Sequence, residues 1–213
     1  DRFATNIKIL DEAGIENREL LLCSAWDFAD SLSASAVGKP ILLVDSRLSN
    51  AQKLLIEKNS AGICYLIGGT GAVSSAVEKE LTAIGKIVER VAGSNRYQTS
   101  VEVAKTFFGN NNDTIMLAYG DDFPDGLVGG SLGVSMHTPL LLINERNTHA
   151  AAEYAKSVNT ERIVALGGTA LISDGSIDDI MPDSGGENPG PDEQVIDKHR
   201  FRCSCIGTYL CGA

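Results

Sequence analysis

Two pairs of aspartates are the residues of this sequence whose type and spacing best suit chemistry. Asp27 and Asp30 flank an aromatic residue, and so do Asp122 and Asp125. Each pair follows a short apolar run of strand length, and ligands of open parallel sheets bind at the carboxyl ends of strands. Two carboxylates there could hold Mg²⁺ or act as a general acid and a general base. The same positions also suit aspartates that begin helices, and no nucleophile accompanies either pair.

Three arginines form a second group of candidates, because a guanidinium fork binds two phosphate oxygens at once. Arg90 and Arg96 belong to the stretch RVAGSNRYQT, and Arg2 belongs to a shortened copy, DRFAT, that opens the sequence. Thr99 begins a capping-box pattern, and Thr5 has the side chain of a helix cap. We therefore expect Arg96 and Arg2 in loops just before helices, whose N–H groups would add donors for an anion. The alternative is that these arginines tie two structural units together.

Other motifs support weaker hypotheses. The run GTGAVS at residues 69–74 follows a predicted strand and is one residue short of a dinucleotide-binding fingerprint. Its counterpart has Ala170 in place of the middle glycine, which favours a tight turn, and no cofactor is predicted. One histidine and three cysteines near the C-terminus could nominally supply zinc ligands, but their spacing is not that of a common structural site. These residues are His199, Cys203, Cys205 and Cys211.

The composition argues against several classes of function. A formal net charge of −10 and a pI of about 4.7 speak against a general nucleic-acid binder, whose footprint is basic. No uncharged apolar run approaches the roughly 18 residues of a membrane span, so none is predicted. Cys23 and Cys64 lie in apolar runs, and we expect both to be buried as small hydrophobic residues.

Six short apolar runs predict strands of parallel sheets, since nearly continuous apolar residues are typical of strands buried on both faces. The runs come in two sets of three, separated by segments with the character of helices, and parallel neighbours require such crossover helices. The first set is residues 20–25, 40–45 and 62–67, and the second set is residues 114–119, 139–144 and 162–166.

Matched motifs recur roughly 95 residues apart, longer than a solenoid repeat, which predicts that each copy is a small domain. We predict an α/β fold of two tandem doubly wound parallel-sheet units, Rossmann- or Toprim-like and pseudo-symmetric, at residues 1–92 and 93–181. The first unit lacks the Arg-x-x-Gly start of the second, so we expect it to be truncated at its N-terminus. Residues 182–213 begin as a linker, match neither copy, and are predicted to lack a packed core.

Both units resemble the cell-wall-binding repeat (type 2) family of Gram-positive surface proteins. The matching segments are RVAGSNRYQT at residues 90–99, GDDFPDGL at 120–127, PLLL at 139–142 and GGT at 167–169. The resemblance implies a noncovalent, non-enzymatic anchor of an extracellular, S-layer-associated protein on an anionic wall polymer, teichoic-acid-like or a phosphate-bearing polysaccharide. It also implies three units around a pseudo-threefold axis, so a third unit from the parent chain or an oligomeric neighbour is an expected partner.

The site that the resemblance implies combines the charged candidates with leucines of the matching apolar segments. The predicted polymer-binding residues are Arg96, Arg90, Arg2, Asp122, Asp125, Asp27, Asp30, Leu141 and Leu42. No catalytic residue, metal or cofactor is implied. The alternative hypothesis is a metal-dependent enzyme of doubly wound fold that uses Asp122 and Asp125.

Overall fold

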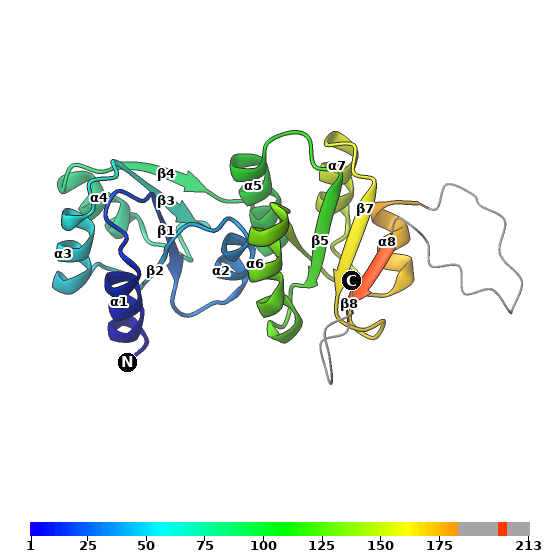
Figure 1. The fold of residues 1–213 in the computed structure, drawn as a ribbon, viewed down its shortest axis with the longest axis horizontal. Helices are drawn as coiled ribbons and strands as arrows, with labels where there is room; N and C mark the ends of the chain where they lie inside the picture. The colour runs from blue at the N-terminus through cyan, green and yellow to red at the C-terminus, as the bar shows by residue number, and fades with distance from the viewer. Residues whose placement is uncertain (183–199, 204–213) are drawn as a thin grey trace, which may run out of the picture.

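Two four-stranded parallel sheets, one after the other along the chain, form the framework of the protein (Figure 1). The computed structural model describes residues 1–182 and 200–203. The first sheet, in the order β2-β1-β3-β4, contains β1 (Leu20–Ser24), β2 (Ile41–Val44), β3 (Ile63–Ile67) and β4 (Ile87–Val91). The second, in the order β6-β5-β7-β8, contains β5 (Thr114–Tyr119), β6 (Leu140–Ile143), β7 (Arg162–Leu166) and β8 (Arg200–Cys203). The predicted α/β fold of two tandem, pseudo-symmetric parallel-sheet units is confirmed.

Helices connect the strands, because a parallel connection must return from one end of the sheet to the other. Those of the first half are α1 (Arg2–Ala13), α2 (Ala29–Ser35), α3 (Asn50–Lys58) and α4 (Ser75–Ala83). Those of the second half are α5 (Arg96–Phe108), α6 (Pro124–Met136), α7 (His149–Ser157) and α8 (Asp174–Ile180). Across the ranges that the structure describes, no helix has both the length and the apolar character needed to cross a membrane.

Each sheet is covered on both faces, and successive residues of a strand serve opposite faces. In β1, Leu20 and Leu22 face a core closed by α1, α3 and α4, whereas Leu21 and Cys23 face the opposite core. In the second sheet, α5, α7 and α8 close one core. The sheets are thus doubly wound. Cys23 and Cys64 are buried, as the sequence predicts, and both are free.

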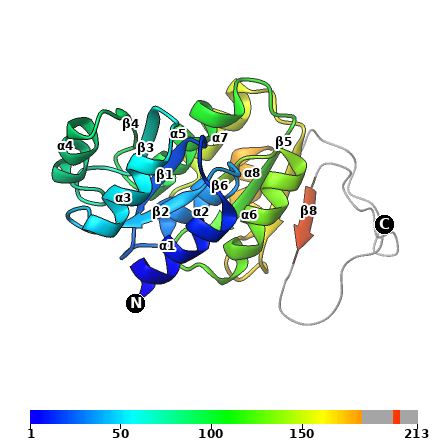
Figure 2. The same cartoon turned by 60° about the vertical axis from the view of Figure 1, so that its left-hand side comes forward.

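Helix α2 lies between the two sheets and joins them (Figure 2). It follows β1 of the first sheet, yet Leu32 and Ala36 pack in one apolar cluster with residues of β5, β6 and β7. It also contacts α5 and α6. Glycines of α6 make this close approach possible: a Cβ added at Gly133 would lie 2.6 Å from the Cβ of Ala36, and one added at Gly126 would lie 2.6 Å from Leu32.

The fourth strand of each sheet was not predicted from the sequence. In β4 the residues alternate between more and less exposed positions, so its sequence, IVERV, lacks the continuous apolar run of the other strands. β8 pairs in parallel with β7, with Arg200 opposite Ile163 and Cys203 opposite Leu166. The prediction that residues 182–213 match neither unit is therefore wrong for residues 200–203, which occupy in the second sheet the position of β4 in the first. His199, Cys205 and Cys211 lie outside the described residues.

Helix α5 begins earlier than predicted. Its cap is Asn95, whose side chain accepts the N–H of Gln98 at 2.9 Å, and Arg96 is the first helical residue. Thr99, the predicted cap, is buried within the first turns of the helix, and its hydroxyl accepts the N–H of Gly93 at 3.1 Å. The prediction failed because an asparagine three residues before a glutamine is an equally good cap and comes first along the chain.

Helix α1 differs from expectation in the same way. Asp1 is its cap, accepting the N–H of Ala4 at 2.8 Å, and the helix begins at Arg2 rather than after Thr5. Arg2 and Arg96 therefore lie in the first turns of helices, not in preceding loops. Because the backbone of both residues is helical, the positions that their guanidinium groups can occupy are restricted.

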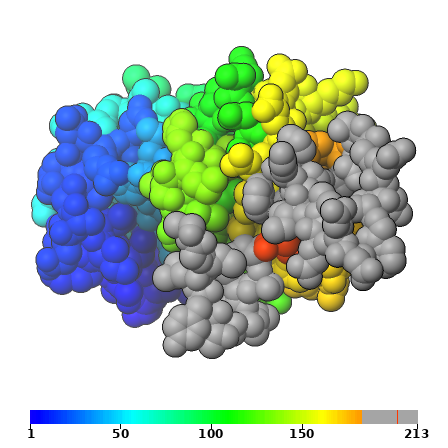
Figure 3. Space-filling view, turned by 45° about the vertical axis from the view of Figure 1, so that its right-hand side comes forward, coloured from blue at the N-terminus to red at the C-terminus, as the bar shows by residue number. Residues whose placement is uncertain are grey.

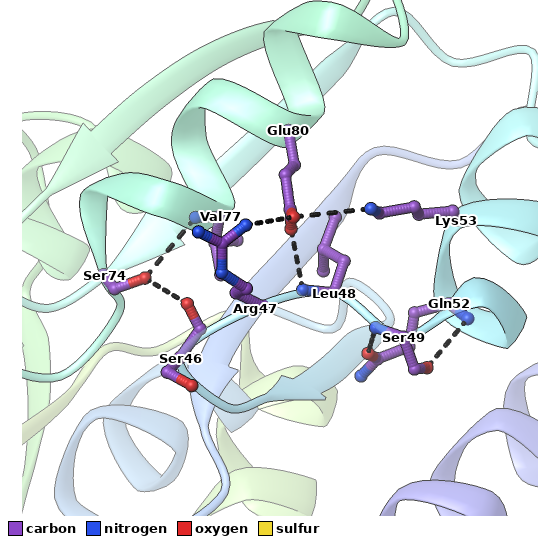
Figure 4. A network of polar contacts seen from close by, with 9 residues as sticks. All are labelled: Ser46, Arg47, Leu48, Ser49, Gln52, Lys53, Ser74, Val77 and Glu80. Carbon is purple, nitrogen blue, oxygen red and sulfur yellow. Dashed lines mark hydrogen bonds and ion pairs between the residues drawn. The ribbon is translucent and has the colours of Figure 1, made fainter.

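Polar contacts fasten the loop after β2 to α4 (Figure 4). Glu80 of α4 accepts the N–H of Leu48 at 2.8 Å and pairs with Lys53 at 3.3 Å and Arg47 at 3.4 Å. The hydrogen bond from the Leu48 backbone, followed by the Lys53 contacts, holds the pKa of Glu80 below its ordinary value. Ser74 donates a further hydrogen bond to a carbonyl of the loop. These contacts fix the chain at the carboxyl edge of the first sheet.

Candidate functional site

A polar cleft of about 540 Å³ opens where the carboxyl edge of the first sheet meets the second half of the chain. Its walls include Asp27 and Asp30 after β1, Gly69 and Gly71 after β3, and Arg96 in the first turn of α5. Because the chain leaves β1 toward β2 on one side and β3 lies on the other, this is the switch point of the sheet. Ligands of doubly wound folds bind in that position.

Arg96 connects the two halves of the chain. Its guanidinium donates to the carbonyl of Gly120, at the end of β5, at 2.8 Å and to the carboxylate of Asp27, after β1, at 3.1 Å. It also lies over the ring of Phe28, 5.4 Å from the centroid. The interpretation of Arg96 as a structural tie thus has direct geometric support, and the same side chain lines the cleft.

Arg2 makes only part of this arrangement. Its guanidinium donates to the carbonyl of Ala25 at the end of β1, as Arg96 does at the end of β5. It then stacks over the ring of Trp26, 4.6 Å from the centroid, and Trp26 is 63% exposed. Arg2 does not line the cleft, so the structure does not bring all three candidate arginines to one place.

Arg90 binds the glycine turn, which is the segment 68–74 between β3 and α4. It lies on β4 and donates to the carbonyl oxygens of Gly68 and Val73, both at 2.9 Å, and to the carboxylate of Glu78 at 2.9 Å. The two bonds to carbonyls fix the turn that forms one wall of the cleft, and the bond to Glu78 ties β4 to α4. The direct role of Arg90 is therefore to position the turn.

Arg202 is a residue that sequence reasoning missed. From β8 it donates to the turn after β7, to the carbonyl of Ile172 at 2.7 Å, to the carbonyl of Gly167 at 3.3 Å and to Asp174 at 2.7 Å. This is the arrangement of Arg90 in the first sheet. The spacing from the glycine turn to the arginine differs greatly between the two halves, which hid the correspondence in the sequence.

The two aspartates after β1 have different surroundings. The carboxylate of Asp27 accepts the N–H of Ala29 at 3.1 Å and the Arg96 guanidinium. Asp30 is 8% exposed, and its carboxylate packs against the α-carbon of Gly68, which has a positive φ of 101°. Burial, then the charge of Asp27, raise the pKa of Asp30 to about 6, while Arg96 opposes the shift. A side chain on residue 68 would collide with this carboxylate.

The second pair of aspartates, Asp122 and Asp125, includes the same contact with a glycine but does not line the cleft. Asp125 packs against Gly167, whose φ is 117°, and Asp122 is exposed and accepts the N–H of Phe123 at 2.8 Å. Within the described part of the chain, no three histidine, cysteine, aspartate or glutamate side chains are grouped as metal ligands would be. Leu42 and Leu141 are fully buried, each in the core of its own sheet.

A polar trio at the end of β5 was also missed. The hydroxyl of Tyr97 donates to Asp121 at 2.6 Å, and the amide of Asn144 donates to Asp121 at 2.7 Å. Burial, then the hydrogen bond to Asp121, raise the pKa of Tyr97 to about 12. Tyr97 and Asp121 border the cleft, so the trio supports its wall on the side of the second sheet.

The corresponding place in the first half is aromatic. Phe3 packs edge-on against Trp26 at a centroid distance of 6.0 Å, and the indole N–H donates to Asp45 at 2.9 Å. A comparison of the two halves position by position pairs these three residues with Tyr97, Asp121 and Asn144. That comparison is the sequence signal that could have found both groups.

The fold and the cleft define a class of protein: two parallel-sheet units in tandem, with a polar site where the glycine turn of one meets the first helix of the next. The family model described as cell wall binding domain 2 (CWB2) matches residues 1–78 and 90–177. The chain belongs to the cell wall binding domain 2 family.

Relatives of known name come from Bacillus subtilis. The chain is 26% identical over 179 residues to the N-acetylmuramoyl-L-alanine amidase LytC, covering 81% of this chain and 36% of that protein. It is 27% identical over 178 residues to an amidase enhancer, covering 81% of this chain and 24% of that protein. The chain thus spans about a third and about a quarter of the lengths of these two relatives.

Two solved structures share the fold. Cwp6 from Clostridium difficile superposes with a TM-score of 0.71 at 21% identity, covering 84% of this chain and 30% of that one. Cwp8 from Clostridium difficile superposes with a TM-score of 0.68 at 24% identity, covering 84% of this chain and 32% of that one. At these identities the likeness concerns the fold.

Proposed function

We propose that this chain is a noncovalent, non-enzymatic anchoring module that holds an extracellular protein on an anionic polymer of the Gram-positive cell wall. The polymer would be teichoic-acid-like or a phosphate-bearing polysaccharide. Membership of the cell wall binding domain 2 family supports wall binding. The observation that carries the choice of site is the cleft at the switch point, where Asp27, Asp30 and Arg96 meet.

The net charge of the chain limits which interactions can bind it to an anionic polymer. A chain of net charge −10 is repelled by an anionic polymer at distances up to about a Debye length, roughly 8 Å at physiological salt. Attachment would therefore require short-range contacts, and we propose that they lie within the cleft. Asp122, Asp125 and Arg2 do not line this cleft. We propose that they contact the polymer only in an assembly with further units, which would form equivalent clefts beside them.

Removal of the wall glycopolymer is expected to abolish attachment. The purified chain should co-sediment with intact Bacillus subtilis walls and not with peptidoglycan stripped of its phosphate-linked glycopolymers by hydrofluoric acid. The measurement is the bound fraction after centrifugation, with serum albumin as a protein of comparable acidity for control. Equal binding to both materials would place the ligand in peptidoglycan and contradict the proposal.

We further propose that a third unit of the same fold packs on the outer face of α6. The contact between the halves joins the equivalent helices α2 and α6, and α2 also packs on the unlike elements α5 and β6. The contacts between unlike elements leave a complementary surface unfilled at each end. On α6 this surface is apolar and exposed, with Leu127 at 60%, Val134 at 50% and Val128 at 47%. In the space-filling view the yellow-green atoms of α6 lie beside the blue first half, so a further unit there would touch both halves (Figure 3).

For the chain alone, a second copy is the available occupant of this face. Sedimentation velocity should show reversible association that grows with concentration. Leu127→Glu should weaken it, whereas Leu54→Glu, at a residue 58% exposed on α3, should not. Equal association of the two variants would contradict a role for α6.

A further inference from the structure

Asp30 is an unusual residue for a protein interior. It is 8% exposed, it lines the cleft, and within the described residues no N–H or O–H group donates to its carboxylate. Its near neighbour Asp27 accepts two such bonds. Buried charged groups are normally paired, because desolvation without a partner is costly. In the part of the chain that the structure describes, no side-chain oxygen is both fully buried and unpaired, so the carboxylate of Asp30 keeps contact with solvent, at the cleft that it lines. A carboxylate left in this state at the wall of a cleft is available to accept hydrogen bonds from a ligand.

Main-chain donors belong to residues that line the same cleft. The N–H groups of Gly69 and Gly71 donate to no other backbone group within the described residues, and both glycines line the cleft. On the opposite wall, the first N–H groups of the 13-residue helix α5, at Arg96 and Tyr97, have no intrahelical acceptor. The residues of the cleft therefore provide one strong acceptor and two sets of main-chain N–H groups that have no backbone acceptor within the described residues.

Three ligand chemistries can be compared with this arrangement. A phosphodiester group of the polymer is an anion that only accepts hydrogen bonds, so it would meet the carboxylates of Asp27 and Asp30 with like charge. A cation would meet the Arg96 guanidinium and the positive end of α5. A hydroxyl group both donates and accepts, so neighbouring hydroxyls of a sugar ring can donate to Asp30 and accept from the main-chain N–H groups.

We propose that the cleft binds an uncharged, hydroxyl-bearing sugar residue of the wall polymer, with Asp30 as the central acceptor, and not the phosphate groups of that polymer. This inference rests on the proposed function and specifies which part of the polymer the site recognises. It fits the structural bonds that Arg90 and Arg96 make, since neither guanidinium group is needed for phosphate.

The test uses neutral oligosaccharides released from purified wall glycopolymer by hydrofluoric acid, which cleaves phosphodiesters. They are titrated into the ¹⁵N-labelled full chain, and inorganic phosphate is titrated separately. The neutral oligosaccharides are expected to shift the amide resonances of Gly69, Gly71 and Tyr97, and phosphate at the same concentration is not. Shifts with phosphate alone, or with neither probe, would overturn the proposal.

Asp30→Asn supplies the second arm. The variant should bind the neutral oligosaccharides roughly tenfold more weakly or worse, since a hydrogen bond to a charged acceptor is lost. Asp113→Asn removes one charge from an exposed residue just before β5, at the opposite edge of the second sheet, and should bind as the wild type does. Unchanged affinity of Asp30→Asn would count against Asp30 as the acceptor.

The stability of the Asp30→Asn variant shows that lost binding is not lost folding. A carboxyl group whose pKa is about 6 in the folded state, above its unfolded value, lowers stability at neutral pH. The facing charges are Asp27, which reinforces this effect, and Arg96, which opposes it. The variant should therefore melt at a higher temperature than the wild type at pH 7. This gain should shrink as the pH falls from about 6 toward 4, where the folded wild type takes up the proton.

The two proposals fail in different ways. If the chain sediments with intact walls but the cleft amides respond only to phosphate, wall anchoring stands and the assignment of a sugar is wrong. If the amides respond to neutral oligosaccharides while the chain ignores walls, the proposed anchoring function is wrong.

Discussion

Replacement of Arg96 by alanine is expected to lower the free energy of unfolding by about 1–3 kcal/mol. The substitution removes the bond to the Gly120 carbonyl and the bond to Asp27, and it leaves the carbonyl without this donor in a partly buried place. It also removes the guanidinium from the ring of Phe28. Urea denaturation followed by circular dichroism measures the change.

Arg2→Ala is the matched control for this prediction. Arg2 makes the same bond to a strand-end carbonyl, yet its other contact is the exposed ring of Trp26 and not a carboxylate across the junction. Exposed contacts of this kind contribute at most about 1 kcal/mol. If the two variants lose equal stability, the tie between the halves is not what Arg96 supplies.

Gly133→Val is expected to have the other large effect, a loss of about 3 kcal/mol or more, because overpacking at this position cannot be relieved easily. An added Cβ would lie 2.6 Å from the Cβ of Ala36, 2.8 Å from the Met116 side chain and 2.9 Å from the backbone carbonyl of Thr138. The fixed backbone of Thr138 and the short side chain of Ala36 have little room to move. Thermal and urea unfolding measure the loss.

Ser131→Val places the same β-branched side chain at an exposed position of α6, two residues away. It introduces the β-branched side chain without the collision, and serine and valine have nearly the same helix propensity, so this variant should be almost as stable as the wild type. The difference between the two variants therefore reports the packing of α6 on α2. A difference below about 1 kcal/mol would mean that the helices can separate freely.

The strands of the cores could be predicted because their residues are apolar on both faces. β5 and β7 have the predicted bounds, and β1 differs by one residue. The edge strand β4 was missed because Glu89 and Arg90 interrupt its apolar residues, and the pattern of a half-exposed strand is weak over five residues. β8 was missed because four residues after a long unmatched segment carry too little information.

The candidate site was predicted in part. Asp27, Asp30 and Arg96 were chosen from the sequence, and the structure brings them together in the cleft. Their division of labour could not be predicted, since it depends on which carboxylate the guanidinium reaches across the junction. Nor could the burial of Asp30 against Gly68, which follows from the positive φ of that glycine and the start of α2.

Helix α2 also affects how the protein unfolds, because it packs in the cores of both sheets. Its residues Leu32 and Ala36 close a core of the second sheet, while Ala34 packs in a core of the first. Unfolding of either sheet would expose apolar surface belonging to the other, so intermediates with one sheet folded are disfavoured relative to both end states. We therefore expect the two halves to unfold as one cooperative unit, so that a mechanical pull on the chain would meet the resistance of both sheets at once.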